Sequence, residues 1–247
     1  MNTIMKKIIF AMSLWSMLSM TGQTLMAQEA SQNQGQAPLD IRETMVYKLQ
    51  RGIYNRAIKY ADVNAAINAL YNICVLEPQN DSLLFLLAYS YFDNQRYFSA
   101  TLTLNDVLLL NPDNLEALEM KAVSLERIGA LDKSLDDYES LYLKSDNISY
   151  LYKVAMLQYQ LKRFKEAKTN IDILLSKKQA DEIKLFFPDE NEEQQEVLMR
   201  ASLHNLKGLI ARDEGNVTEA KKQFGIALEV QPEFYVAKTN LQEVSSQ

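Results

Sequence analysis

The sequence of 247 residues contains one cysteine, Cys74, and one histidine, His204. These counts exclude an intrachain disulfide and a zinc site built from several Cys or His side chains. Glycine occurs only 7 times and proline 5 times, which argues against a turn-rich all-β fold or a collagen-like chain. Basic residues (26) are fewer than acidic residues (32), and the net charge of -6 argues against a nucleic-acid-binding surface.

Sequence motifs of catalysis are also absent. The chain has no G-x-x-x-x-G-K-[ST] or G-x-G-x-x-G loop, no H-E-x-x-H, no G-x-S-x-G and no calcium-binding loop. His204 has no evident nucleophile or orienting partner nearby, and Cys74 lies between two apolar residues, so both are predicted to be packing residues. The sequence therefore predicts a protein without catalytic site, metal or cofactor.

The first 27 residues have the pattern of a secretory signal peptide. Two lysines precede an apolar run over residues 8–20, which is too short to cross a bilayer. We expect cleavage after Ala27, and residues 28–39 are polar, which is typical of a flexible linker. No cysteine lies near the junction for lipid attachment. The sequence thus predicts export to the periplasm, with secretion as the alternative, and no stable membrane insertion after cleavage.

Internal repeats are the strongest feature of the remaining chain. Five segments of about 34 residues share small residues at their eighth and twentieth places and large or apolar residues at their twenty-fourth. Small residues 12 places apart fit two closely crossing helices. The segments start at Tyr47, Asp81, Leu115, Ile148 and Ala201; their small places include Ala88 and Ala100, Ala122 and Ser134, Ala155 and Ala167, and Gly208 and Ala220.

These residues resemble the tetratricopeptide repeat (TPR), a pair of antiparallel helices. The best matches are Leu87, Ala88, Tyr91, Ala100 and Pro112 in the second segment, and Gly208, Gly215, Ala220, Phe224, Ala227 and Pro232 in the fifth. The resemblance covers residues 47–234 and implies an all-α fold, a right-handed superhelical solenoid of about five helix pairs. Tyr54 departs from the pattern at a small place, and Asp146 and Gln179 replace the expected prolines.

The domain organisation follows from the repeats. Residues 40–181 are predicted to form TPR units 1–4, and residues 201–247 unit 5 with a C-terminal capping helix. Residues 182–200 form an acidic insertion, for which we expect a loop over 182–188 and a long helix starting near Glu190. The Asp40-x-x-Glu43 spacing predicts that the first helix begins near Ile41.

The resemblance also implies that the first helix of each unit lines a concave groove. Its predicted partner-binding side chains are Lys48, Arg51 and Asn55 at a basic end, Phe85, Tyr89 and Phe92 in the second unit, and Tyr152, Met156 and Tyr159 in the fourth. The third unit contributes an acidic wall with Glu116, Glu119 and Glu126. The alternative is that the aromatic rings pack between neighbouring first helices and expose little. The clamp for chaperone C-termini found in some family members is excluded by Leu86, Glu116 and Met120.

Two functions are compatible with this pattern. The first is a non-enzymatic adaptor of the cell envelope that binds a segment of another protein in the groove, with the acidic part of that segment toward Lys48 and Arg51. The alternative is a structural or self-assembling subunit of an envelope complex, joined through the capping helix or the acidic insertion. An exposed apolar patch on Val236, Leu241 and Val244 would favour the alternative.

Overall fold

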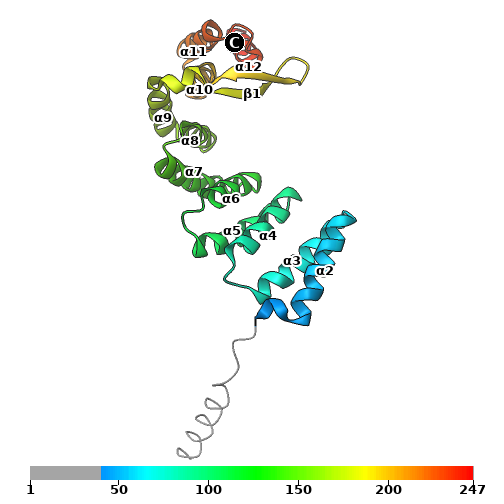
Figure 1. Cartoon of the computed structure of the whole chain (residues 1–247). Helices are drawn as coiled ribbons and strands as arrows, with labels where there is room; N and C mark the ends of the chain where they lie inside the picture. The colour runs from blue at the N-terminus through cyan, green and yellow to red at the C-terminus, as the bar shows by residue number, and fades with distance from the viewer. Residues whose placement is uncertain (1–39, 247) are drawn as a thin grey trace, which may run out of the picture.

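The computed structural model describes residues 40–246, so the predicted signal peptide (1–27) and linker (28–39) lie outside the described residues. Within them, antiparallel helix pairs stack into a bowed solenoid, and a terminal helix follows the last pair (Figure 1). The pairs are α2 (Met45–Lys59) with α3 (Val63–Leu76), α4 (Asp81–Asp93) with α5 (Tyr97–Leu110), α6 (Leu115–Arg127) with α7 (Leu131–Ser145), α8 (Ile148–Gln160) with α9 (Phe164–Ser176), and α10 (Met199–Asp213) with α11 (Val217–Val230), before α12 (Tyr235–Ser245). The predicted solenoid of antiparallel helix pairs is confirmed.

Each helix pair turns through one residue in the left-handed conformation. These residues are Ala61, Gln95, Gly129, Lys162 and Gly215, and their φ angles lie between 55 and 80 degrees. The amide of the next residue donates to the carbonyl five positions back, at 2.8–2.9 Å in every pair. This arrangement is a Schellman-type helix end, and it satisfies carbonyls that the helix leaves unpaired.

The small places bring the two helices of a pair into contact. Ala88, Ala100, Ala122, Ala155, Ala167 and Ala220 are all fully buried. Gly208 on α10 faces the ring of Phe224 on α11 so closely that a Cβ atom there would lie 2.4 Å from Cε1 of the ring. Large side chains such as Tyr138, Leu141, Ile171 and Leu174 fill the central core between pairs. The repeat therefore alternates close backbone approach with filled interfaces.

Asparagines start several first helices. The side chains of Asn80, Asn114 and Asn147 accept from backbone amides in the first turns of α4, α6 and α8. Before α8, Asp146 takes the left-handed conformation at the end of α7. This residue replaces the Pro-containing connection found before α6, and it accounts for the fourth unit starting one residue early.

The first helix begins later than the sequence predicts. Asp40 caps a short 3-10 helix, η1 (Ile41–Glu43), by accepting from the amide of Arg42. Thr44 then caps α2 by accepting from the amide of Tyr47. The cap predicted at Asp40 therefore starts a separate turn, and α2 itself begins at Met45.

The insertion is not the predicted loop and long helix. After a 3-10 turn, η2 (Lys178–Asp181), it forms an antiparallel hairpin of β1 (Lys184–Pro188) and β2 (Gln194–Leu198). Helix α10 starts at Met199 and not near Glu190. The acidic run forms the turn of the hairpin, where Asp189 accepts from the amides of Asn191 and Glu193.

Contacts along both strands hold the hairpin to the C-terminal unit. The ring of Phe187 packs edge-on against Phe234, with 5.1 Å between centroids. Gln195 donates to the carbonyl of Glu233 at 2.7 Å, and the amide of Leu198 donates to Gln231 at 2.8 Å. A two-stranded hairpin is marginal by itself, so these contacts with the α11–α12 connection stabilise it.

Helix α12 covers the open side of the last pair. Ala237 and Val244 on its inner side are fully buried against the last pair, while its outer positions include the exposed Lys238, Gln242 and Glu243. A polar outer face at the end of a solenoid is what a capping element requires. No helix within residues 40–246 has the length and apolar character needed to cross a bilayer.

Candidate binding groove

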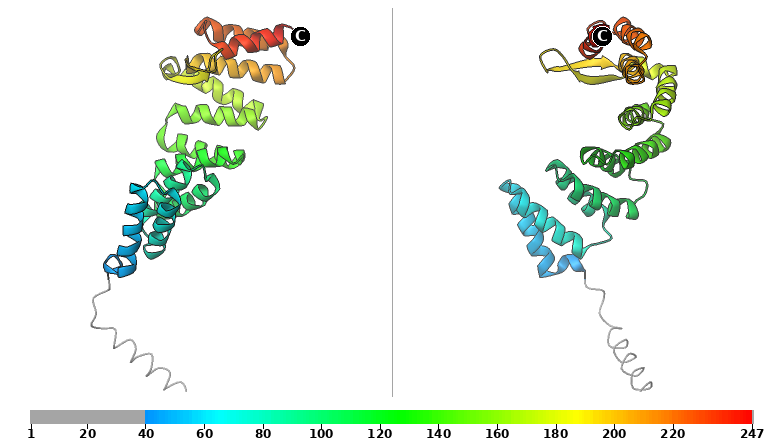
Figure 2. Two further views of the ribbon diagram at one scale, coloured as in Figure 1. Left: turned by 90° about the vertical axis from the view of Figure 1, so that its right-hand side faces the viewer. Right: turned by 180° about the vertical axis from the view of Figure 1, so that it is seen from behind.

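The first helices of the pairs line the inner side of the bowed stack. Figure 2 shows α2, α4, α6 and α8 on this side, with their partner helices outside, and the β1–β2 hairpin extends over the same side from the C-terminal end. The groove is therefore bounded by the helix pairs along its length and by the hairpin at one end.

The groove contains a hollow of about 640 Å³ between α6 and α8. Its lining residues come mainly from the groove-facing positions of the third and fourth units, and Leu185 of β1 closes one side. The lining residues are Glu119, Val123, Glu126, Arg127, Leu131, Tyr138, Ser149, Tyr150, Tyr152, Lys153, Gln160 and Leu185.

The hollow contains charges of both signs. The hydroxyl of Tyr150 donates to Glu119 at 2.7 Å, and burial together with this bond raises the pKa of Tyr150 to about 12. Lys153 lies 3.4 Å from Glu126, and its ammonium is 5.9 Å from the centre of the Tyr138 ring. Arg127 has no ion pair among residues 40–246 and is exposed. Its guanidinium is therefore free to donate hydrogen bonds to a carboxylate of a bound partner.

The predicted basic end lies on α2 at the N-terminal end of the groove. Lys48, Arg51 and Asn55 are all exposed. Lys48 pairs with Glu43 at 2.6 Å, in a contact whose two side chains are both largely exposed to solvent. Arg51 forms no ion pair within the described chain. Because exposed pairs are weak, both cations can be reached by an acidic ligand.

The predicted aromatic residues of the second unit differ in exposure. Tyr89 is 50% exposed on α4 and is the aromatic ring of this group that projects furthest into solvent. Phe85 is half-buried and packs against the core of its own unit. Phe92 is also half-buried, with its ring edge-on to Tyr97 at 5.6 Å. Tyr89 is therefore the best placed of the three to contact a ligand.

The three predicted residues of the fourth unit connect units to one another. Tyr152 is buried, at 8% exposure, and its hydroxyl lies 2.7 Å from Ser202 on α10. The hydroxyl of Tyr159 donates to Asp213 at 3.0 Å, and its ring packs beside Phe164. Met156 is half-buried against the central core. At Tyr152 the structure therefore follows the alternative, in which the aromatic ring packs between neighbouring first helices. Only the small exposed part of this side chain lines the hollow.

Sequence reasoning did not find the hairpin's part in the groove, or the roles of Tyr150 and Lys153. Leu185 was assigned to a loop, and its alternation with Phe187 in a short apolar run was the available strand signal. Tyr150 and Lys153 lie beside the groove positions of the repeat pattern, and they turn toward the hollow through their bonds to Glu119 and Glu126.

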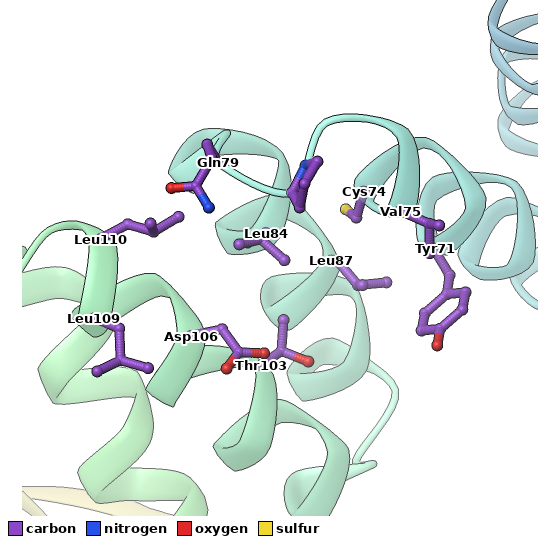
Figure 3. Close-up of a pocket in the computed structure, with 11 residues that line it drawn as sticks. Tyr71, Cys74, Val75, Gln79, Leu84, Leu87, Thr103, Asp106, Leu109 and Leu110 are labelled. Atoms are coloured by element: carbon purple, nitrogen blue, oxygen red, sulfur yellow. The ribbon is translucent and has the colours of Figure 1, made fainter. Parts of the chain in front are cut away.

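The two residues with reactive side chains lie away from the hollow. Cys74 is buried beside another pocket, formed by α3, α4 and α5 (Figure 3), and burial raises the pKa of its thiol to about 11. Burial lowers the pKa of His204, whose Nδ1 lies 2.8 Å from the side-chain oxygen of Gln223. Residues 40–246 contain no group of three or more His, Cys, Asp or Glu side chains placed to hold a metal ion.

Comparison with known proteins finds similarity in structure but not in sequence. No family model and no curated protein matches the chain. The solved structure of MamA aligns over 76% of this chain and 92% of its own, with a TM-score of 0.56 and 18% identity. MamA from Desulfovibrio magneticus RS-1 aligns over 77% of this chain and 98% of its own, with a TM-score of 0.53 and 16% identity.

A third solved structure is YrrB, described as a TPR protein with an unusual peptide-binding site. It aligns over 75% of this chain and 87% of its own, with a TM-score of 0.57 and 12% identity. At these identities the likeness concerns the fold. Together with the repeated helix pairs, their left-handed turns and their small contact places, it shows that the chain has the fold of the tetratricopeptide repeat proteins.

Proposed function

We propose that this protein is a non-enzymatic adaptor that binds a segment of another protein in its concave groove. The observation that carries the proposal is the hollow of about 640 Å³ between α6 and α8, on the inner side of the solenoid. Its volume is in the range of pockets that hold several side chains of a ligand. The peptide-binding site named for YrrB, which shares the fold, is consistent with this use of the groove.

The groove favours a segment with acidic and aromatic or apolar side chains. Arg51 at the N-terminal end and Arg127 in the hollow are cations without a partner among residues 40–246. Tyr89 is exposed between them and offers a flat apolar surface with a polar tip. A segment that binds here would place carboxylates against Arg51 and Arg127 and an apolar side chain against the ring of Tyr89.

The proposed place of action is the cell envelope. Support comes from the signal-peptide pattern over residues 1–27, which is followed by a polar stretch before the repeats. N-terminal sequencing of the protein recovered from the periplasmic fraction tests this directly. A chain that starts after Ala27 is expected, and a full-length chain recovered from the cytoplasm would contradict export.

The structural-subunit alternative loses its expected surface on the capping helix. Val244 is fully buried, and Val236 and Leu241 are half-buried against the last pair. These residues therefore form the interior of the C-terminal unit and offer no exposed apolar patch. This result removes the capping helix as a candidate surface for a protein partner.

The test is affinity capture from the envelope fraction, followed by titration of the captured partner's binding segment. The variant Tyr89→Ala with Arg127→Ala removes two exposed groove side chains without opening the core. The matched control is Phe98→Ala, because Phe98 is an exposed ring (65%) on the outer helix α5. Binding lost in the groove variant and kept in the control supports the proposal. Equal binding by the groove variant, the control and the wild type would overturn it.

A further inference from the structure

The N-terminal end of the solenoid has an apolar face that nothing in the described chain covers. Five side chains of α2 and its end are exposed on one side of the helix: Met45 (85%), Val46 (56%), Leu49 (58%), Ile53 (40%) and Tyr60 (67%). We call these five residues the α2 end face. Their spacing of three, four and seven residues places them on one stripe, which is separate from the side of α2 that carries the buried Tyr47 and Ala57.

This end differs from the other end of the same solenoid. Helix α12 closes the C-terminal pair with exposed polar side chains on its outer positions. A helix pair at the end of a stack cannot bury its outer apolar face by itself, and solenoids usually end in a polar cap. The α2 end face therefore has the composition of an internal interface, although it lies at the end of the described stack (Figure 1).

The same helix is basic in an acidic protein. Helix α2 carries Lys48, Arg51, Arg56 and Lys59 and no acidic residue, while the whole chain has a net charge of -6. Arg56 lies within the α2 end face at helical spacing from Leu49, and Lys59 lies beside it. Neither forms an ion pair within residues 40–246. The occupant of this face should combine apolar side chains with negative charge.

The opposite end of the chain offers that combination in the β1–β2 hairpin. Its turn holds Asp189, Glu190, Glu192 and Glu193, and the last three have no ion pair in the described chain. Phe186 on β1 is 63% exposed, with its ring on the face of the hairpin that points away from α12. We call Phe186 and these four acidic residues the hairpin tip.

We propose that a second copy of this protein occupies the α2 end face with its hairpin tip, joining copies head to tail. The contact places Phe186 against Leu49 and Ile53 and the glutamates of the turn against Arg56 and Lys59. A two-fold contact between two α2 helices is disfavoured, because it would bring two basic helices together.

The two surfaces lie at opposite ends of the solenoid, so the contact is heterologous (Figure 2). Such contacts produce rings or open-ended chains, because each bound copy still has one free end. This interaction uses residues other than Tyr89 and Arg127, so it is independent of the groove proposal. A variant that loses self-association is therefore expected to keep partner binding in the groove, and a variant that loses partner binding is expected to keep self-association.

The experiment measures self-association by sedimentation velocity, over a range of protein concentrations at 50 mM and 500 mM salt. Two charge-reversal variants are compared: Arg56→Glu with Lys59→Glu on the α2 end face, and Glu190→Lys with Glu193→Lys on the hairpin tip. The matched control reverses exposed lysines of the C-terminal unit, Lys221→Glu with Lys238→Glu. Thermal unfolding of each variant verifies that the fold is kept.

For the wild type and the control we expect a mass that rises with concentration and falls at high salt. Each reversal alone should raise the dissociation constant by about tenfold or more, since opposed charges become like charges. An equimolar mixture of the two reversals restores complementary ends and should associate again, which a general loss of stability would not do.

Three outcomes would overturn the proposal. The first is a wild-type mass that stays monomeric at all concentrations, and the second is association that both reversals leave unchanged. The third is a mixture of the reversals that stays monomeric while the wild type associates. The α2 reversal is also tested with vesicles containing anionic lipid. If the wild type binds these vesicles through the α2 end face and does not self-associate, the occupant is a membrane surface.

Discussion

The close contact between α10 and α11 at Gly208 gives a sharp test of the packing argument. Gly208 of α10 is buried and faces the ring of Phe224 on α11, which is itself fully buried. A Cβ atom at Gly208 would lie 2.4, 2.5 and 2.9 Å from three carbons of that ring. The substitution Gly208→Ala therefore forces the ring or the helices to move.

Two opposing effects set the magnitude. Ala is a better helix former than Gly, which favours the variant by about 1 kcal/mol. Overpacking a dense core costs about 1–3 kcal/mol, and the upper part of this range applies because the ring has no solvent-exposed side to turn into. We expect a net destabilisation of about 2 kcal/mol, which lowers the melting temperature by about 4–8 °C in a domain of this size.

The chain offers a matched control in Gly225, an interior residue of α11. A Cβ atom there would meet nothing within 4 Å, so Gly225→Ala gains the propensity without a clash. We expect it to raise stability by about 0.5–1 kcal/mol. Circular dichroism melts of the two variants should thus shift in opposite directions.

The substitution Phe224→Leu, alone and combined with Gly208→Ala, completes a double-mutant cycle. It removes the ring that the new Cβ would strike, so it should be much less costly in the Gly208→Ala background than in the wild type. If Gly208→Ala stabilises the protein as Gly225→Ala does, close approach at the small places is not what the repeat requires. Additive effects of Gly208→Ala and Phe224→Leu would refute the contact itself.

Three further predictions concern single contacts. Tyr152→Phe leaves the hydroxyl of Ser202 without its 2.7 Å partner and should cost about 1–2 kcal/mol in urea unfolding, with no loss if the units are not joined there. Lys162→Gly relieves a left-handed residue (φ 58 degrees) and should stabilise by about 0.5–1 kcal/mol; a lower melting temperature would contradict this. The bond from Arg42 holds the pKa of Glu77 at about 2, below its unfolded value. This contribution to stability is complete above about pH 4.5 and is lost as the pH falls toward 2. The melting temperature should therefore fall less steeply between pH 5 and 2 for Glu77→Gln than for the wild type.

The repeat and its fold could be predicted because their signals are local and recur. The small residues at the eighth and twentieth places, exemplified by Ala88 and Ala100, are fully buried where the helices cross. Among the turn residues, only Gly129 and Gly215 have a residue type that favours the left-handed conformation. Ala61, Gln95 and Lys162 take it because the two helices that flank them are held by the pair's core.

The groove was predictable in position but not in detail. The pattern named Glu119 and Glu126 as groove-facing, and both residues line the hollow. It could not tell that Tyr152 is turned into the interface with α10, because the bond to Ser202 joins residues 50 positions apart.

The sequence by itself determined the helix pairs, their number and their order, because each pair is specified by residues within one repeat. Tertiary structure alone decided the fate of the insertion. Its acidic run resembles a helix start, yet β1 and β2 pair because Phe187 packs on Phe234 and because Gln195 and Gln231 bind backbone groups across the unit. It also decided that one end of the stack is covered by α12, while no other part of residues 40–246 covers the apolar and basic face of α2, since burial depends on neighbours that no local pattern encodes.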